Sequence, residues 1–119
     1  MKIEELTANT FQKRVVNLDN DPAMWDYLGD KPCIIMFYTP WCSLCMSLIK
    51  QLEELNKAYN EELYLYKVNI EVEKRIATNL NVRTVPTLFY CPLDQEPQTV
   101  VGLVSKEKIV EMINDVLLE

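Results

Sequence analysis

Residues 33–45 read CIIMFYTPWCSLC, six consecutive apolar residues followed by a turn and two cysteines three positions apart. The apolar run Cys33–Tyr38 lies between Pro32 and Pro40, and its length and composition predict a β-strand that is buried on both faces. Strands of this kind are central in their sheet and usually parallel to a neighbour. The arrangement of the whole chain is therefore best worked out from this strand.

A strong helical pattern follows the strand. Within residues 43–60 the apolar side chains recur three or four positions apart, at Leu48, Leu52, Leu55 and Tyr59, with charged residues between them. This spacing predicts an amphipathic helix. The two cysteines therefore stand where the buried strand leads into this helix.

The remaining segments alternate between strand and helix patterns. Further strands are expected over Lys2–Leu6, Leu63–Ile70, Thr87–Cys91 and Thr99–Leu103. Helices are expected from a Thr7 cap through Val16, from Asp21-Pro22 through Met24, Trp25 and Leu28 to Gly29, over 76–80, and from a Ser105 cap through Leu117. The order βαβαβαββα predicts one α/β domain over residues 1–119, with a mixed sheet covered by helices on both faces.

Composition excludes several kinds of chemistry. The chain has 119 residues and no histidine, so it cannot build a Ser-His-Asp triad, a Cys-His pair or a His-ligated metal site. Its two glycines leave no Gly-rich loop for phosphate. A formal net charge of −6 without a basic cluster makes nucleic acid and anionic membranes poor partners.

The sequence also bears on location. Its longest apolar run, Cys33–Tyr38, is far shorter than the roughly 18 residues that a membrane span requires. Residues 1–6 show no apolar segment of a secretion signal, so we expect a cytoplasmic protein, while an exported form that has lost its signal stays an alternative.

Cys42 and Cys45 form a Cys-x-x-Cys pair at the start of the predicted helix. One helical turn separates them on the same side, which allows a disulfide. The positive end of the helix stabilises a thiolate at Cys42 and lowers its pKa, so we expect Cys42 to be the nucleophile. Cys45, one turn further on, is expected to stay protonated until it resolves a mixed disulfide formed by Cys42.

Metal binding is the alternative interpretation of the same pair. A zinc site would need two further ligands, and only Cys33 and Cys91 could supply them. A four-cysteine [2Fe–2S] cluster would also need these residues, at spacings that do not match. A Cys-x-x-Cys beside a strand-helix pattern favours redox chemistry without a metal.

Four stretches in order now resemble the thioredoxin family: residues 37–45, Lys67–Ile70, Val85–Thr87 and Val101–Ser105. The resemblance covers nearly the whole chain and implies the thioredoxin fold, a central mixed sheet flanked by helices on both faces. It implies a monomeric thiol-disulfide oxidoreductase that reduces disulfide-containing client proteins and is recharged by a thioredoxin reductase-like donor. No cofactor other than the Cys42–Cys45 disulfide is then required.

The resemblance also implies roles for single residues. Trp41 would shield the dithiol, Val85 would offer its backbone to an extended client strand, Pro86 would be cis against the sulfurs, and Gly102 would complete an apolar rim. The plainer alternatives are a core aromatic at Trp41, a trans turn proline at Pro86 and a strand-end bulge at Gly102.

Several positions depart from the family pattern. Ser43-Leu44 replaces the usual Gly-Pro, so the family's reduction potential does not carry over to this chain. A disulfide oxidase or isomerase, or a thioredoxin-fold binding module, therefore stays an alternative. Met36 stands where the family has a buried aspartate, next to the matching lysine, Lys67.

Cys33 and Cys91 lie outside the family motif. They are interpreted as small buried apolar side chains at strand ends, with a regulatory disulfide between them as the remote alternative.

Overall fold

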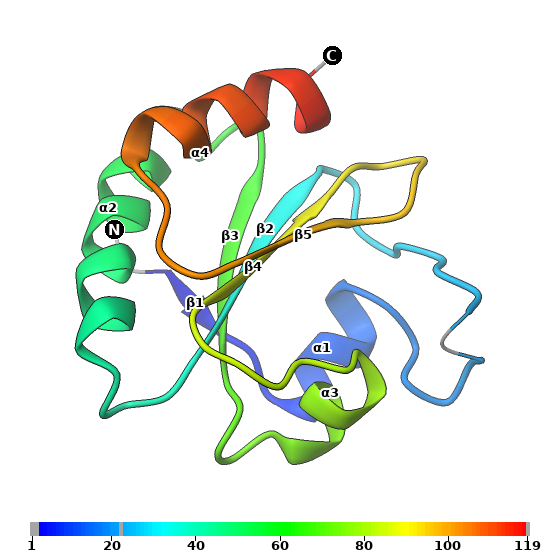
Figure 1. Cartoon of the computed structure of the whole chain (residues 1–119). Helices are drawn as coiled ribbons and strands as arrows, with labels where there is room; N and C mark the ends of the chain where they lie inside the picture. Colours follow the sequence, from blue (N-terminus) through cyan, green and yellow to red (C-terminus); the bar gives the residue numbers. More distant parts are fainter. Residues whose placement is uncertain (1–2, 22, 119) are drawn as a thin grey trace.

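The computed structural model describes residues 3–21 and 23–118 (Figure 1). The order of helices and strands along the chain is the predicted one apart from one expected helix. The elements are β1 (Glu4–Glu5), α1 (Ala8–Arg14), β2 (Cys33–Tyr38), α2 (Ser43–Tyr59), β3 (Tyr64–Asn69), α3 (Lys74–Asn79), β4 (Thr87–Cys91), β5 (Gln98–Val101), α4 (Lys106–Met112) and the π-helical turn η1 (Ile113–Leu117).

The strands form one mixed sheet in the order β1-β3-β2-β4-β5. β1, β3 and β2 are parallel, whereas β4 runs antiparallel to both β2 and β5. The predicted central strand is therefore confirmed: β2 lies between β3 and β4, and all six of its residues are buried.

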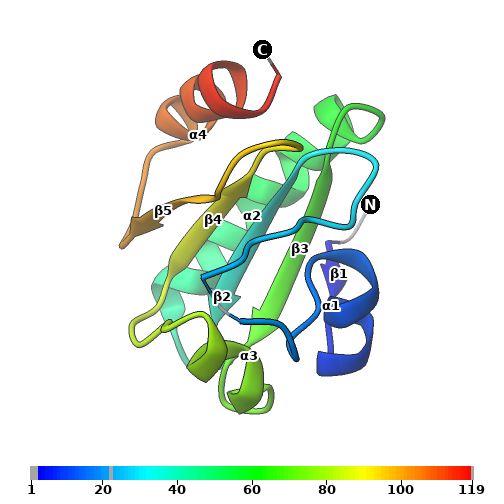
Figure 2. The same ribbon diagram turned by 90° about the vertical axis from the view of Figure 1, so that its right-hand side faces the viewer.

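The side chains of β2 alternate between two core layers. Ile34, Met36 and Tyr38 enter the layer formed with α2, α4 and η1, and Cys33, Ile35 and Phe37 enter the layer formed with α1 and α3. Figures 1 and 2 show these helices on opposite faces of the sheet. The two-sided burial expected from the continuous apolar run thus separates odd and even positions into different cores.

Helix α2 has the apolar face that its spacing predicts. Leu48, Leu52 and Leu55 are buried against the sheet, and the helix is continuous over 17 residues. Every residue of α2 has a backbone N–H, because Lys50 occupies the position at which the family has a proline.

The helix predicted from Asp21-Pro22 to Gly29 is wrong. Pro22 lies outside the described residues, and residues 23–32 contain no helix. Trp25 and Tyr27, two positions apart, pack against the core, while Met24 is 71% exposed. Burial at alternate positions suits an extended segment, and the Leu28 N–H accordingly bonds the distant Val15 carbonyl at 2.8 Å.

The ends of some elements also shift. β1 is shorter than predicted and Lys2 lies outside the described residues, whereas the last helix changes at Ile113 into a π-helical turn. In the described part of the chain, no helix has the length and apolar character needed to cross a membrane.

Ser105 supports α4 as predicted, because its Oγ accepts a hydrogen bond from the Lys108 N–H at 3.1 Å. We expect Ser105→Ala to lower the free energy of unfolding by about 1 kcal/mol, the usual cost of losing such a cap. Urea unfolding measures it. The matched control is Ser47→Ala, an exposed serine inside α2 where alanine should be neutral or slightly stabilising. Equal effects of the two substitutions would contradict the role of the cap.

Candidate active site

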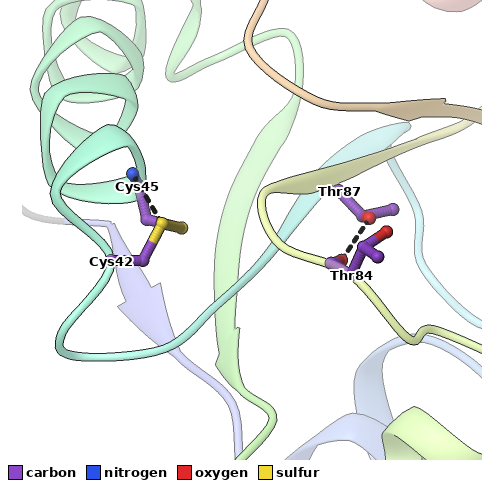
Figure 3. Close-up of a disulfide and its surroundings, with 4 residues drawn as sticks. All are labelled: Cys42, Cys45, Thr84 and Thr87. Carbon is purple, nitrogen blue, oxygen red and sulfur yellow. Dashed lines mark hydrogen bonds between the residues drawn. A yellow bond between two sulfur atoms is a disulfide. The ribbon is translucent and has the colours of Figure 1, made fainter.

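Cys42 and Cys45 lie where β2 leads into α2. Cys42 is the N-cap of α2, and its sulfur accepts a hydrogen bond from the Cys45 N–H at 3.1 Å (Figure 3). The two residues form a disulfide with their Cα atoms 5.2 Å apart. A donor aimed at this sulfur at a helix N-terminus stabilises negative charge on it.

The two cysteines differ in exposure. Cys45 is fully buried in the α2 core layer beside Met36 and Leu48, whereas Cys42 is half-buried and packs against the edge of that layer. A client disulfide can therefore approach Cys42 more readily than Cys45.

The loop before β4 faces this pair. Figure 3 shows the disulfide pointing from α2 toward the segment that carries Thr84, in the loop, and Thr87, the first residue of β4. The Thr87 hydroxyl donates to the Thr84 carbonyl at 2.7 Å and closes the loop around Val85–Pro86, whose peptide bond is cis. Val85 packs against the same core layer as Cys42.

Gly102 is tied to this loop. Its N–H donates to the Pro86 carbonyl at 2.8 Å, which places the residue after β5 directly beside the loop. Gly102 has a φ of +98°, and no other atom lies within 4 Å of the point that a Cβ would occupy. Glycine is favoured here by the backbone conformation rather than by crowding.

Trp41 is not a core residue. Its side chain is 71% exposed immediately before Cys42, and Leu44 between the cysteines is 51% exposed. Val101 and Leu103, on either side of Gly102, are also exposed. Exposed apolar side chains of this size next to a reactive pair are typical of a surface that binds a partner.

Beneath the pair, Met36 and Lys67 are register partners on β2 and β3, as the resemblance implied. Met36 is fully buried. The Lys67 Nζ lies 3.9 Å from Glu5 Oε1, and the Tyr38 hydroxyl donates to the same oxygen at 2.5 Å. Burial, followed by this hydrogen bond, raises the pKa of Tyr38, so its hydroxyl stays a donor at neutral pH.

Sequence reasoning missed Glu5. It reaches Lys67 because β1 and β3 are parallel with Glu5 opposite Lys67. The available signal was an acidic residue within the short strand predicted over Lys2–Leu6. Its carboxylate is the counter-charge of the Lys67 ammonium.

The four cysteines are not brought together. Cys33 and Cys91 lie in the core layer of α1 and α3, and Cys45 lies in the other layer. The four-cysteine zinc or iron–sulfur arrangement is therefore wrong. Within residues 3–21 and 23–118, no three Cys, Asp or Glu residues are grouped as metal ligands would be.

Comparison with known sequences agrees with this geometry. The sequence model of the family described as Thioredoxin matches residues 2–115. The chain belongs to the thioredoxin family. It is 34% identical to the thioredoxin of Borreliella burgdorferi over 110 residues, which cover 92% of this chain and 93% of that protein.

Other thioredoxins are more distant. The thioredoxin of Rickettsia bellii is 30% identical over 87 residues, covering 73% of this chain and 83% of that protein. The chloroplastic M-type thioredoxin of Spinacia oleracea is 27% identical over 100 residues, covering 82% of this chain and 55% of that protein. Family membership and the Cys42–Cys45 pair together make this thioredoxin-family chain a dithiol-disulfide oxidoreductase of protein disulfides.

Met36 leaves the buried side of the pair without a proton acceptor of its own. We expect Met36→Asp to lower the free energy of unfolding by about 1 to 3 kcal/mol, because a polar group is buried with incomplete partners. Burial raises the pKa of the introduced carboxyl in the folded state, so the cost grows as pH rises above its unfolded value of about 3.9. Urea unfolding at pH 4 and pH 7 measures this. Met36→Leu, an apolar control, should cost less than about 1.5 kcal/mol at both pH values.

The same variant tests the proton's route. A folded Met36→Asp protein should resolve mixed disulfides faster near neutral pH, since the carboxylate accepts the Cys45 proton, while Lys67→Met should leave that rate nearly unchanged. Stopped-flow measurement across pH follows the step. A rate that collapses in Lys67→Met would show that the proton leaves through the lysine.

Proposed function

We propose that the chain reduces protein disulfides, with Cys42 as the nucleophile and Cys45 as the resolving thiol. The observation that carries the proposal is the difference between the two sulfurs. Cys42 caps a helix, accepts a backbone hydrogen bond and is partly accessible, whereas Cys45 is fully buried. A thiolate is favoured at the first position and a thiol at the second.

The reaction then has two exchanges. The Cys42 thiolate attacks one sulfur of the client disulfide, forming a mixed disulfide and releasing the other client sulfur as a thiolate. Cys45 loses its proton and attacks the Cys42 sulfur, which forms the Cys42–Cys45 disulfide and releases the second client thiolate. Two electrons pass to the client, and a reductase returns them to the pair. We expect water or the departing client thiolate to take the Cys45 proton, because the Lys67 ammonium faces Glu5.

The client is proposed to lie across the surface between α2 and the loop before β4. Trp41 would cover the apolar side of the dithiol, and Val85 would pair its backbone with an extended client segment. Pro86 and Gly102 are joined by their hydrogen bond and would form the opposite rim. The exposed apolar side chains at Trp41 and Leu44 support an unfolded or extended client rather than a small charged one.

The remaining parts of the proposal concern context. We propose a monomer in the cytoplasm, with no cofactor beyond the redox-active disulfide and no nucleic-acid or membrane partner. The acidic net charge of −6 supports the last point. Reducing clients continuously requires a compartment that keeps thiols reduced and supplies a reductase.

Single-cysteine variants test the roles. Cys42→Ser should abolish reduction of a disulfide-containing protein such as insulin, because no other thiol can start the exchange. Cys45→Ser should accumulate mixed disulfides with clients, visible by non-reducing electrophoresis and mass spectrometry, because the resolving thiol is gone. Cys91→Ala, which removes a buried thiol on the opposite face, is the control and should keep the wild-type rate. Full activity of Cys42→Ser would disprove the assignment.

Equilibration against glutathione and dithiothreitol buffers separates reductant from oxidant. We expect a Cys42–Cys45 potential nearer to the roughly −270 mV of a reducing thioredoxin than to the roughly −120 mV of a strong oxidant. A value near the oxidising end would favour the alternative role as disulfide oxidase or isomerase. A pair that never exchanges with the buffer would leave only a binding module.

A further inference from the structure

Two free thiols face each other in the core on the other side of the sheet. Cys33 on β2 and Cys91 on β4 are directly opposite each other in the antiparallel register, and both are fully buried. Directly opposite residues point to the same face of a sheet. Both lie in the core layer of α1 and α3.

The spacing of such a pair suits a disulfide. Opposite residues in antiparallel strands have Cα atoms about 4.5 to 5.5 Å apart, within the range of about 4.4 to 6.8 Å that disulfides span. Cys33 and Cys91 are such an opposite pair. Burial, followed by the neighbouring Cys33, raises the pKa of the Cys91 thiol well above its ordinary value. The pair is thus held close together and protonated.

Tyr27, in the segment between α1 and β2, packs against the core layer that contains both cysteines, and its side chain is called the Tyr27 cover. Its hydroxyl donates to the Lys31 carbonyl at 2.5 Å, and burial together with the neighbouring Cys33 raises its pKa. The phenol folds back so far that a Cβ at Gly29 would overlap it. This cover belongs to residues 23–32, which carry no helix or strand, so it can lift without breaking the sheet.

We propose that Cys33 and Cys91 form a second redox couple, oxidised to a disulfide by peroxide when the Tyr27 cover opens. It is separate from Cys42–Cys45, because it lies at the other end of the six-residue β2, about 17 Å along the strand, and on the other face. When both cysteine pairs are reduced, the chain can then give up four electrons by forming two disulfides, instead of two electrons by forming one.

The oxidation balances with hydrogen peroxide alone. When the cover opens, one thiol loses its proton to water, and the thiolate attacks a peroxide oxygen. The O–O bond breaks, and a sulfenic acid and hydroxide form, the hydroxide taking up the released proton as water. The second sulfur attacks the sulfenic sulfur, the S–S bond forms, and a second water leaves. The two thiols lose two electrons and two protons in total, and a dithiol such as dithiothreitol reverses the step by exchange.

Peroxide titration of the fully reduced wild-type protein tests the proposal. After acid quenching, alkylation in denaturant and peptide mass spectrometry, we expect a Cys42–Cys45 peptide first and a linked Cys33–Cys91 peptide pair at higher peroxide. Cys33→Ala should abolish the second product. If Cys33 and Cys91 stay alkylatable, or end as sulfinic acids or intermolecular disulfides, the proposal is overturned.

The cover has its own test. Tyr27→Ala should speed formation of the Cys33–Cys91 disulfide by about tenfold or more, because the protected state loses its lid. Tyr59→Ala is the matched control, since it removes a half-buried phenol from the opposite core layer and should leave the rate unchanged. Equal rates in the two variants would overturn the role of Tyr27.

A chain with both Cys42 and Cys45 replaced by alanine keeps this result independent of the proposed reductase activity. The Cys33–Cys91 disulfide should form there at the wild-type rate. Its loss in that variant would show that the active-site pair delivers the oxidation, which overturns a separate couple.

Discussion

Burial of β2 on both faces is the constraint on which the rest of the structure depends. Its six residues lie between β3 and β4, so every backbone polar group along the strand can be paired within the sheet and both faces are free to carry side chains into a core. The even positions pack under α2 and the odd positions under α1 and α3. Two neighbouring strands and two core layers hold β2 in place. The turn that follows it therefore fixes the position of Cys42 at the N-terminus of α2.

The sequence was sufficient for those elements whose own periodicity matches their burial. The continuous apolar run at Cys33–Tyr38 corresponds to β2, which is buried on both faces. The helical spacing over residues 43–60 corresponds to α2, which is buried on one face. The prediction for residues 23–29 was wrong because Trp25 and Tyr27 are partly buried against the core while Met24 and Leu28 are exposed. From the sequence alone, the apolar residues of this segment fit one face of a helix as well as one side of an extended chain. Only the contact of Trp25 and Tyr27 with the core distinguishes the two.

The candidate site shows the same division between local and long-range information. The Cys-x-x-Cys spacing and the cap position of Cys42 are local, and the sequence predicted both. The hydrogen bond from Gly102 to Pro86 and the approach of Glu5 to Lys67 join segments far apart in the chain, through strand registers that a single sequence does not specify. Residue types could be named for these contacts, but their partners could not.

The alternation of side chains along β2 also decides which buried sulfur atoms lie in the same core layer. Cys33 is at an odd position and Met36 at an even one, so they belong to different core layers although only three residues separate them. Cys45 and Met36 share a layer, and a thioether there neither accepts a proton nor holds a charge, which keeps the environment of the resolving sulfur apolar. Cys33 and Cys91 share the other layer, where the register rather than a helix end brings the sulfurs together. The active-site pair is therefore made reactive by a helix cap and by the partial exposure of Cys42. The second pair is held close together by the strand register, and no helix end activates its thiols. The same strand supports both pairs because the side chains on its two faces pack in different core layers.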